Sequence, residues 1–274
     1  MSTLSYVHGA SEKALIGQTI GCFFDEACAR HAERDALVVR HQGVRLSYAG
    51  LKHKVDALAC GLMRLGLQPG ERIGIWSQNN LEWALTQFAA AKAGLVLVNI
   101  NPAYRLAELE YALNKVGCRA LVLSPTFKSS NYLEMLAELA PELAHCEPGL
   151  LRSHVLPTLE FVIRQGVELT PGMLNFDELL KSPARDELAA LALLSEKLQF
   201  DDPINIQFTS GTTGHPKGAT LSHHNILNNG YFVGEAIGLV AGDRLCIPVP
   251  LYHCFGMVMG NLGCLTHGAT MVYP

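Results

Sequence analysis

Residues 208–218 read Phe208-Thr209-Ser210-Gly211-Thr212-Thr213-Gly214-His215-Pro216-Lys217-Gly218, and an apolar run, 204–208, leads into them. Three glycines in this stretch allow the main chain to turn sharply with its N–H groups facing one way, and such a row of amides binds anionic oxygens. Four hydroxyl side chains add donors, and Lys217 adds a positive charge that suits a polyphosphate. The stretch therefore predicts a loop that binds a nucleoside triphosphate.

Other interpretations of this loop fit the sequence less well. A solvated Gly/Ser/Thr loop needs neither the apolar strand before it nor the proline and glycine on either side of Lys217. The ordinary P-loop, G-x-x-x-x-G-K-[ST], requires a glycine in place of Pro216 and a hydroxyl residue in place of Gly218. No two glycines are separated by a single residue, which excludes the dinucleotide pattern G-x-G-x-x-G. No G-x-S-x-G elbow supports a serine hydrolase.

Residues 209–218 resemble the phosphate-binding signature of the adenylate-forming superfamily, which includes acyl-CoA synthetases, the adenylation domains of peptide synthetases and luciferases. In that superfamily a carboxylate attacks the α-phosphate of ATP to give an acyl-adenylate and pyrophosphate, and the protein positions the reactants and stabilises charge. The resemblance implies that magnesium bridges the phosphates and that Lys217 and Thr212 are the catalytic residues of the loop. The nucleotide-binding residues that it implies are Thr209, Ser210, Gly211, Thr212, Thr213, Gly214, His215, Pro216, Lys217 and Gly218.

A second candidate segment reads Pro250-Leu251-Tyr252-His253-Cys254-Phe255-Gly256. His253 falls between a predicted strand end and a predicted helix start, where open α/β sheets place their ligand crevices. A lone histidine is more often a satisfied core residue. The superfamily carries a similar P-x-x-H-x-x-G segment that lines the acyl pocket, and Pro250, His253 and Gly256 match it. The resemblance therefore implies that His253 and Gly256 belong to the substrate pocket.

Two further polar segments have mainly structural interpretations. Adjacent histidines on a helix point about 100° apart and do not converge on a metal, so His223 and His224 are expected to pack at a helix start. Ser222-His223-His224-Asn225 is similar to a superfamily segment that follows the loop. The segment 99–104, which begins Asn99-Ile100-Asn101-Pro102, is expected to be a structural turn, although its place after a strand could let it touch ligand.

Composition bounds the remaining possibilities. With 49% hydrophobic residues, 17% charged residues and a net charge of −4, the chain lacks the basic excess of a nucleic-acid-binding protein. Its eight cysteines form no C-x-x-C pair, so we expect reduced, buried thiols, no zinc site and a cytoplasmic location. No secretory signal is recognisable at the start of the chain. The uncharged segment 245–274 is interrupted by prolines and glycines, which favours a buried helix and strand over a membrane span.

Hydrophobic periodicity predicts an α/β fold of predominantly parallel sheets flanked by helices, because strands and helices alternate from residue 72 to about 139. Helices are predicted at 19–30, 51–65, 81–93, 106–116, 186–197, 223–237 and 254–265. Strands are predicted at 36–40, 44–48, 72–76, 95–100, 119–123, 159–164, 204–208, 244–249 and 269–273.

The resemblance covers most of the chain and is weakest over 141–199. It implies one incomplete N-terminal AMP-binding domain, in which the C-terminal lid domain is absent. Within it we expect helices and a hairpin, then βα units, then a variable connection, then the βα units of the phosphate loop and acyl pocket, at 1–70, 71–140, 141–200 and 201–274. The superfamily's later motifs, which hold adenine and ribose and supply a second lysine, have no counterpart before Pro274.

Two functions follow as expectations. Segments 72–123 and 245–273 are most similar to medium-chain fatty acid–CoA ligases, which implies an acid–CoA ligase with ATP, magnesium, coenzyme A and a carboxylic acid as its ligands. The alternative is a truncated remnant without catalysis that binds nucleotide weakly or binds only a partner chain, and the isolated chain is then expected to show no acid-dependent ATP–pyrophosphate exchange. A chain that stops inside a sheet is also expected to expose an unpaired strand edge, through which it could self-associate.

Overall fold

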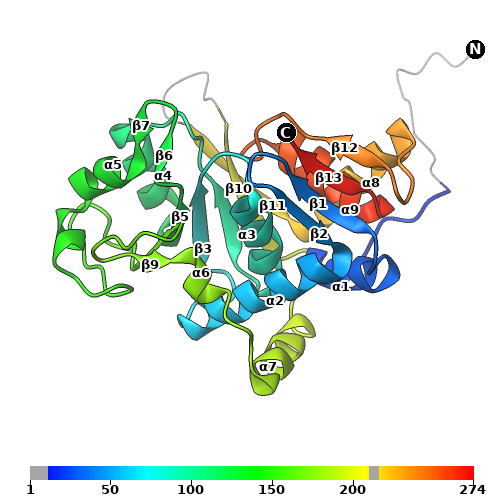
Figure 1. The fold of residues 1–274 in the computed structure, drawn as a ribbon, viewed down its shortest axis with the longest axis horizontal. Coiled ribbons are helices and arrows are strands. Elements are labelled where there is room, and N and C mark those ends of the chain that lie inside the picture. Colours follow the sequence, from blue (N-terminus) through cyan, green and yellow to red (C-terminus); the bar gives the residue numbers. More distant parts are fainter. Residues whose placement is uncertain (1–11, 210–215) are drawn as a thin grey trace, which may run out of the picture.

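The structure is a computed structural model that describes residues 12–209 and 216–274. Two main β-sheets lie side by side, with helices between them and on their outer faces (Figure 1). The larger sheet has seven strands in the order β11-β10-β4-β3-β5-β8-β9, and the smaller has four in the order β12-β13-β1-β2. The predicted α/β class with helices flanking mainly parallel sheets is confirmed.

The seven-stranded sheet is parallel except at one edge. Neighbouring strands from β10 across to β9 run parallel, and only β11 is antiparallel, paired with β10. Its strands are β3 (Arg72–Trp76), β4 (Val96–Asn99), β5 (Cys118–Leu123), β8 (Phe161–Arg164), β9 (Leu174–Asn175), β10 (Pro203–Thr209) and β11 (Lys217–Ser222). The carboxyl ends of β3, β4, β5 and β10 therefore meet at one edge of the sheet, where parallel α/β sheets bind their ligands.

Alternate residues of the central strands enter two separate cores. Ile73 and Ile75 of β3 pack with α2 (Tyr48–Arg64) and α3 (Leu81–Lys92). Trp76 faces the other side, where it stacks on Tyr132 at a ring-centroid distance of 3.6 Å. That second core also holds α4 (Leu106–Val116) and α5 (Tyr132–Leu139). The period of two along β3 thus explains why helices cover both faces.

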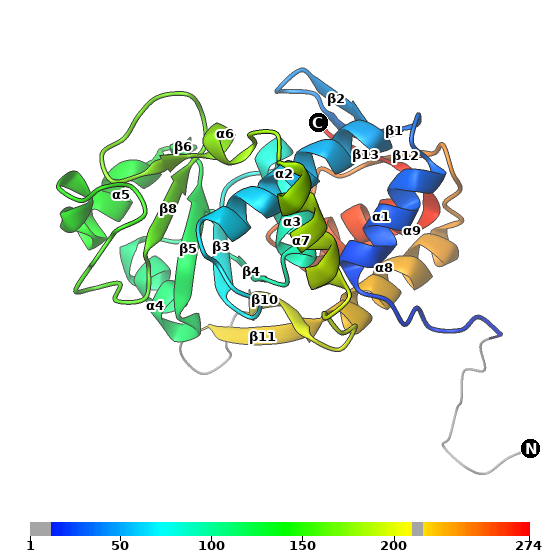
Figure 2. The same ribbon diagram turned by 90° about the horizontal axis from the view of Figure 1, so that it is seen from below.

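The four-stranded sheet joins the two ends of the described chain. Its strands are β1 (Asp35–Val39), β2 (Val44–Ser47), β12 (Arg244–Cys246) and β13 (Thr270–Tyr273). β13 is an inner strand, parallel to both β1 and β12. The expectation that the last strand leaves an unpaired edge is therefore wrong, because the N-terminal hairpin supplies its neighbour. Helices α1 (Ile20–Arg30), α8 (His223–Ile237) and α9 (Gly263–His267) lie beside this sheet (Figure 2).

Several elements differ from the sequence-based expectation. β11 was not predicted as a strand, so the glycine-rich stretch connects two antiparallel strands. β12 ends at Cys246 because Pro248 and Pro250 have no N–H to donate. The helix predicted at 254–265 begins as a π-helix, η2 (Phe255–Leu262). The connection 141–199 contains η1 (Pro141–Ala144), α6 (Phe176–Leu179) and α7 (Arg185–Ser195) besides β8 and β9, and the hairpin β6 (Thr126–Phe127) and β7 (Ser130–Asn131) precedes α5.

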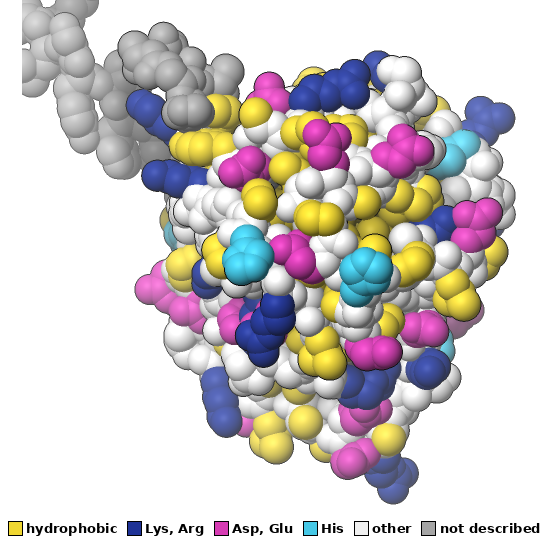
Figure 3. All heavy atoms as spheres, turned by 90° about the vertical axis from the view of Figure 1, so that its left-hand side faces the viewer, with side chains coloured by type: hydrophobic (Ala, Val, Ile, Leu, Met, Phe, Trp, Pro, Cys, Tyr) yellow, Lys and Arg dark blue, Asp and Glu magenta, His cyan; other side chains and the backbone are white. Residues whose placement is uncertain are grey.

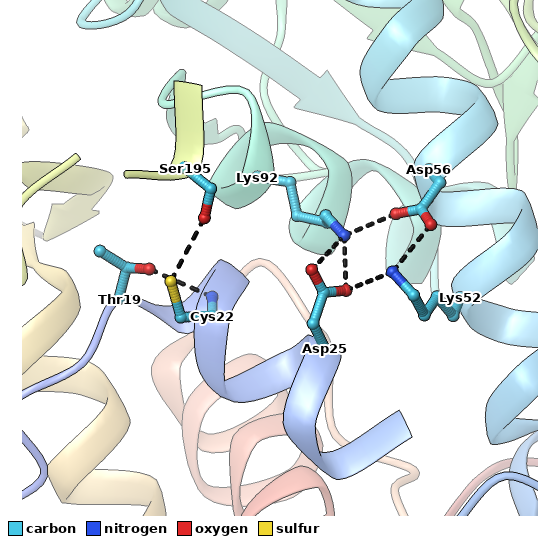
Figure 4. A network of polar contacts seen from close by, with 7 residues as sticks. All are labelled: Thr19, Cys22, Asp25, Lys52, Asp56, Lys92 and Ser195. Carbon is cyan, nitrogen blue, oxygen red and sulfur yellow. Dashed lines mark hydrogen bonds and ion pairs between the residues drawn. The ribbon is translucent and has the colours of Figure 1, made fainter. Parts of the chain in front are cut away.

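A cluster of four charged side chains ties the first three helices together (Figure 4). The Lys92 ammonium of α3 lies 2.5 Å from an Asp25 oxygen of α1 and 2.6 Å from an Asp56 oxygen of α2. Lys52 contacts the same two carboxylates at 2.6 and 2.8 Å. Burial opposes the charge of Lys52, but its hydrogen bonds to Asp25 and Asp56 outweigh burial and raise its pKa. Only 5% of the Lys92 side chain is exposed, so the two carboxylates must offset the cost of burying its positive charge.

His223 is a packing residue at the start of α8, as predicted. Its side chain is fully buried, and its Nδ1 accepts a hydrogen bond from the Ile20 N–H at 3.0 Å. Because Nδ1 is an acceptor, the neutral ring carries its proton on Nε2. Burial lowers the pKa of His223 to about 4.

We expect the fold to become less stable as the pH is lowered, because His223 is buried in its neutral form. In the unfolded chain a histidine binds a proton near pH 6.5, whereas the native ring binds one only near pH 4. Between these values the unfolded chain holds more protons, so the free energy of unfolding should fall by about 2 kcal/mol from pH 7 to pH 5. Urea denaturation of wild type and His223→Asn at both pH values measures this, and the variant should lose most of the slope. The variant His224→Asn keeps the His223 ring and should keep the slope; equal slopes in all three proteins would refute the assignment.

The cysteines agree only partly with the expectation of reduced, buried thiols. All eight cysteines are unpaired, and burial raises the pKa of the Cys28, Cys118 and Cys264 thiols to about 12. Cys246 and Cys254 are exposed, so the prediction of buried thiols is wrong for these two, and Cys22 and Cys146 are only half-buried. On the face shown in Figure 3, acidic and basic side chains are interspersed. Within residues 12–209 and 216–274, no helix is both long and apolar enough to cross a bilayer.

Candidate active site

The phosphate loop predicted from the sequence connects β10 and β11 at the carboxyl edge of the large sheet. Thr209 ends β10 directly opposite Lys217, which begins β11, and Phe208 lies opposite Gly218. The Thr209 hydroxyl donates a hydrogen bond to the Lys217 carbonyl at 3.4 Å, and both side chains are exposed. Ser210, Gly211, Thr212, Thr213, Gly214 and His215 lie outside the described residues. The described ends of the loop therefore present one hydroxyl and one ammonium group side by side.

Neighbouring elements anchor the second end of the loop. The Pro216 carbonyl accepts a hydrogen bond from the Tyr111 hydroxyl of α4 at 3.1 Å. Gly218 leaves little room for a side chain, because a Cβ there would lie 3.1 Å from Ile206 Cγ2 of β10. These contacts fix where Lys217 leaves the sheet, but the Lys217 side chain itself projects from an exposed position.

The second predicted segment lies at the same edge of the sheet. Asn79, which follows β3, fixes the backbone at the start of this segment. Its Nδ2 donates to the Val249 carbonyl at 2.8 Å, and its Oδ1 accepts from the Leu251 N–H at 2.8 Å. His253 is exposed, and its Nδ1 accepts from the Phe255 N–H at 3.2 Å, so the neutral ring donates through Nε2. This geometry leaves an N–H donor for a ligand oxygen.

Gly256 is buried and has a packing role. A Cβ at this position would lie 2.5 Å from the Pro250 carbonyl oxygen, a distance that side chains do not tolerate. Glycine thus lets η2 start against the Pro250 backbone. π-Helices are rare and occur often at functional sites, which agrees with the position of η2 directly after His253.

A cavity of about 400 Å³ opens beside the 250–256 segment, next to the ends of β3, β4 and β12. Its lining residues are Gln78, Asn79, Asn101, Pro102, Ala103, Phe127, Lys128, Pro248, Pro250, Tyr252 and Pro274. The lining contains one lysine and no acidic side chain, and it is mainly apolar with several amides, which suits a carboxylate with an apolar tail. A second hollow of about 390 Å³ lies at the opposite edge, beside Arg72, Val96 and Pro203, away from the predicted chemistry.

The structure brings together some predicted residues and adds others. Asn101 forms the expected turn, with its Oδ1 accepting from the Ala103 N–H at 2.9 Å, and it also lines the cavity. Tyr252 lines the cavity, whereas its neighbour His253 is not among the lining residues. Asn79 was missed, whereas Lys128, which also lines the cavity, is an exposed lysine. The polar run that follows the strand 72–76 could have indicated Asn79, because such residues reach the sheet edge.

The described residues contain no group of three or more histidine, cysteine or acidic side chains able to hold a metal.

Comparison with known proteins agrees with this geometry. The model of the AMP-binding enzyme family matches residues 24–274. Medium-chain acyl-CoA ligase ACSF2, mitochondrial, from Homo sapiens is 47% identical over 274 residues, an alignment that covers 98% of this chain and 44% of that protein. The putative acyl-CoA synthetase YngI of Bacillus subtilis is 39% identical over 260 residues, covering 94% of this chain and 47% of that protein. The chain thus spans less than half the length of these relatives.

The expectation of a cytoplasmic location is contradicted by the same comparison. The ACSF2 relatives from human, rat, mouse and zebrafish are all named as mitochondrial. The reduced thiols that suggested the cytoplasm indicate only a reducing environment, which is why they could not locate the protein.

Solved structures show the same fold. The anthranilate CoA ligase AuaEII in complex with anthranoyl-AMP superposes with a TM-score of 0.79 at 22% identity, covering 97% of this chain and 46% of that one. The N-terminal domain of FACL13 from Mycobacterium tuberculosis superposes with a TM-score of 0.74 at 22% identity, covering 94% of this chain and 57% of that one. Because the family model matches residues 24–274, the chain belongs to the AMP-binding enzyme family.

Proposed function

We propose that this chain carries the phosphate-binding and acid-binding parts of an acid–CoA ligase that acts on a medium-chain fatty acid. A carboxylate oxygen attacks the α-phosphorus of ATP, the bond to the β-phosphate oxygen breaks, and acyl-AMP and pyrophosphate form. The thiol of coenzyme A then attacks the acyl carbon and releases AMP. The observation that supports this most directly is the placement of Thr209 and Lys217 at the same sheet edge as the 250–256 segment and its cavity.

The side chains at this edge of the sheet would each contribute to the adenylation step. The Lys217 ammonium would hold oxygens of the β- and γ-phosphates as these become the leaving group, and the Thr209 hydroxyl would join it by turning from its 3.4 Å hydrogen bond with the Lys217 carbonyl. The mainly apolar cavity beside Tyr252 would take the acyl chain. His253 lies outside the cavity lining, next to Tyr252, and its exposed Nε2–H would be offered to the carboxylate end. Magnesium, when bound, neutralises charge on the phosphates. The remaining contribution of the protein is to hold the two reactants in line.

Octyl triphosphate tests this function on the 274-residue chain by calorimetric titration in the presence of magnesium. This probe joins an eight-carbon chain to the α-phosphate, as in the adenylation step, and omits adenosine. If both subsites lie at one edge, it should bind at least about 100-fold more tightly than inorganic triphosphate or octanoate alone, because the second contact becomes intramolecular. Octyl sulfate controls for binding of the alkyl chain alone.

The same titration distinguishes the proposed ligase from a remnant without catalysis. A remnant that only binds nucleotide would bind triphosphate and gain nothing from the octyl chain. Equal affinities for octyl triphosphate and triphosphate would therefore refute the proposed acid site while leaving the phosphate site in place.

A further inference from the structure

A row of buried amide side chains connects the strand of the phosphate loop to the acid-binding segment. Asn205 and Gln207 lie on one face of β10, and Asn99 ends the neighbouring strand β4. The Gln207 Nε2 donates to Asn205 Oδ1 at 2.9 Å, and the Asn205 Nδ2 donates to Asn99 Oδ1 at 2.9 Å. The Asn99 Nδ2 then donates to the Tyr252 carbonyl at 3.1 Å. The row thus runs from two residues before Thr209 to the residue before His253.

The row also holds the start of the π-helix. The Met257 sulfur lies 3.1 Å from Asn99 Nδ2 and 3.5 Å from Gln207 Nε2. From the other side, Gln87 of α3 donates to the Met257 carbonyl at 3.2 Å and accepts from Asn261 at 2.8 Å. Buried amides therefore form hydrogen bonds with Tyr252 and Met257, the residues on either side of the His253–Gly256 turn.

These amides are unusual for a protein core. Asn99 and Asn205 are each 1% exposed and Gln207 is 8% exposed, yet none of the three leaves a buried polar atom without a partner. Apolar side chains would fill the same space at a lower cost of desolvation. A fully satisfied polar row, by contrast, holds only in one arrangement, because any slip leaves amides unpaired in a low dielectric. The row therefore specifies the relative position of β10, β4 and the 250–257 segment.

We propose that Asn99, together with Asn205 and Gln207, is a positioning residue that fixes the acid-binding segment relative to the phosphate-binding strand. The inference rests on the proposed function, since it matters only if a carboxylate and a polyphosphate bind at this edge together. Asn99 does not contact the reacting atoms; it acts through the Tyr252 carbonyl and so sets where Tyr252 and His253 lie. Misplacement of reactants by about 1 Å can cost about 100-fold in rate, so such a device has a clear use.

Asn99→Ala tests the inference with the same three ligands. The variant should bind inorganic triphosphate and octanoate within about twofold of wild type, because each ligand needs one subsite only. Its affinity for octyl triphosphate, which needs both subsites in register, should fall about 10-fold, a coupling typical of linked sites. A merely structural role for Asn99 would change all three affinities together or none of them.

Asn228→Ala is the matched control. Asn228 is also a buried amide, 6% exposed, with three hydrogen bonds, to the N–H and carbonyl of Ile16 and to the carbonyl of His224, but it lies outside the row. It should leave all three affinities unchanged. If Asn99→Ala does not fold, Gln207→Met makes the same test, since it removes the amide and keeps the length of the side chain.

The outcomes are distinct. If wild type binds octyl triphosphate no more tightly than inorganic triphosphate, the proposed function fails and the inference fails with it. If wild type shows the gain and both Asn99→Ala and Gln207→Met keep it, the proposed function stands and the positioning role is overturned.

Discussion

Replacement of Lys92 by methionine is expected to lower the free energy of unfolding by about 3–5 kcal/mol, the cost of removing one partner from a buried ion pair. Lys92 is 5% exposed and lies within 2.6 Å of both Asp25 and Asp56. Without it, Lys52 is the one cation left to both carboxylates in the described part of the chain, and the Asp56 side chain is just 14% exposed. Methionine keeps the length and apolar stem, so the loss reports the charge. Urea denaturation at pH 7 measures the difference.

Arg244→Met is the matched control for Lys92→Met. Arg244 also pairs with an aspartate, Asp35, but at 3.6 Å and with 52% of its side chain exposed. Exposed pairs contribute about 0–1 kcal/mol, so this variant should unfold almost as wild type does. A Lys92→Met protein within 1 kcal/mol of wild type would show that the cluster drawn in Figure 4 does not hold α1, α2 and α3 together.

Lys217→Ala is expected to weaken binding of MgATP by about 10- to 100-fold. A hydrogen bond to a charged group contributes about 1.5–3 kcal/mol, and each 1.4 kcal/mol is a factor of ten in affinity. Lys217 leaves β11 from an exposed position opposite Thr209, where no packing depends on its side chain, so the fold should be unaffected. Calorimetric titration at low and moderate salt measures the loss, which should shrink as salt screens the charge.

Lys181→Ala serves as the control for the change in net charge. Lys181 is exposed in the connection between α6 and α7, away from the loop. Its removal should change MgATP affinity less than twofold. Equal affinities of Lys217→Ala and wild type would mean that Lys217 does not contact the phosphates.

The local elements of the fold could be predicted because they depend on local patterns. Apolar runs such as 72–76 and 95–100 gave the central strands, and glycine ended helices at positions such as Gly117, where φ is +62°. β11 escaped prediction because Lys217–Ser222 contains only two apolar residues, Ala219 and Leu221; it is a strand because β10 supplies its partner. The inner position of β13 depends on β1, more than two hundred residues earlier, and no local pattern encodes that pairing.

The site was predictable to the extent that one segment carried the chemistry. The stretch 208–218 indicated phosphate binding by its residue types alone. The roles of Asn99 and Asn205 were not visible, because a buried amide in a strand looks the same as an exposed one until its partners are known. The π-helix was also missed, since its first turns follow the same apolar pattern as an α-helix.

We expect Lys217 to lie at the phosphates of bound ATP, and an affinity label that reacts with lysine can show whether it does. In adenosine diphosphopyridoxal an aldehyde stands in place of the γ-phosphate, and it forms an imine with a nearby lysine that borohydride reduces to a stable amine. Peptide mapping by mass spectrometry after labelling of the 274-residue chain should find the label on Lys217, and magnesium pyrophosphate should prevent it. Labelling spread over other lysines, or labelling of Lys217 that pyrophosphate leaves unchanged, would show that Lys217 does not lie at the phosphates.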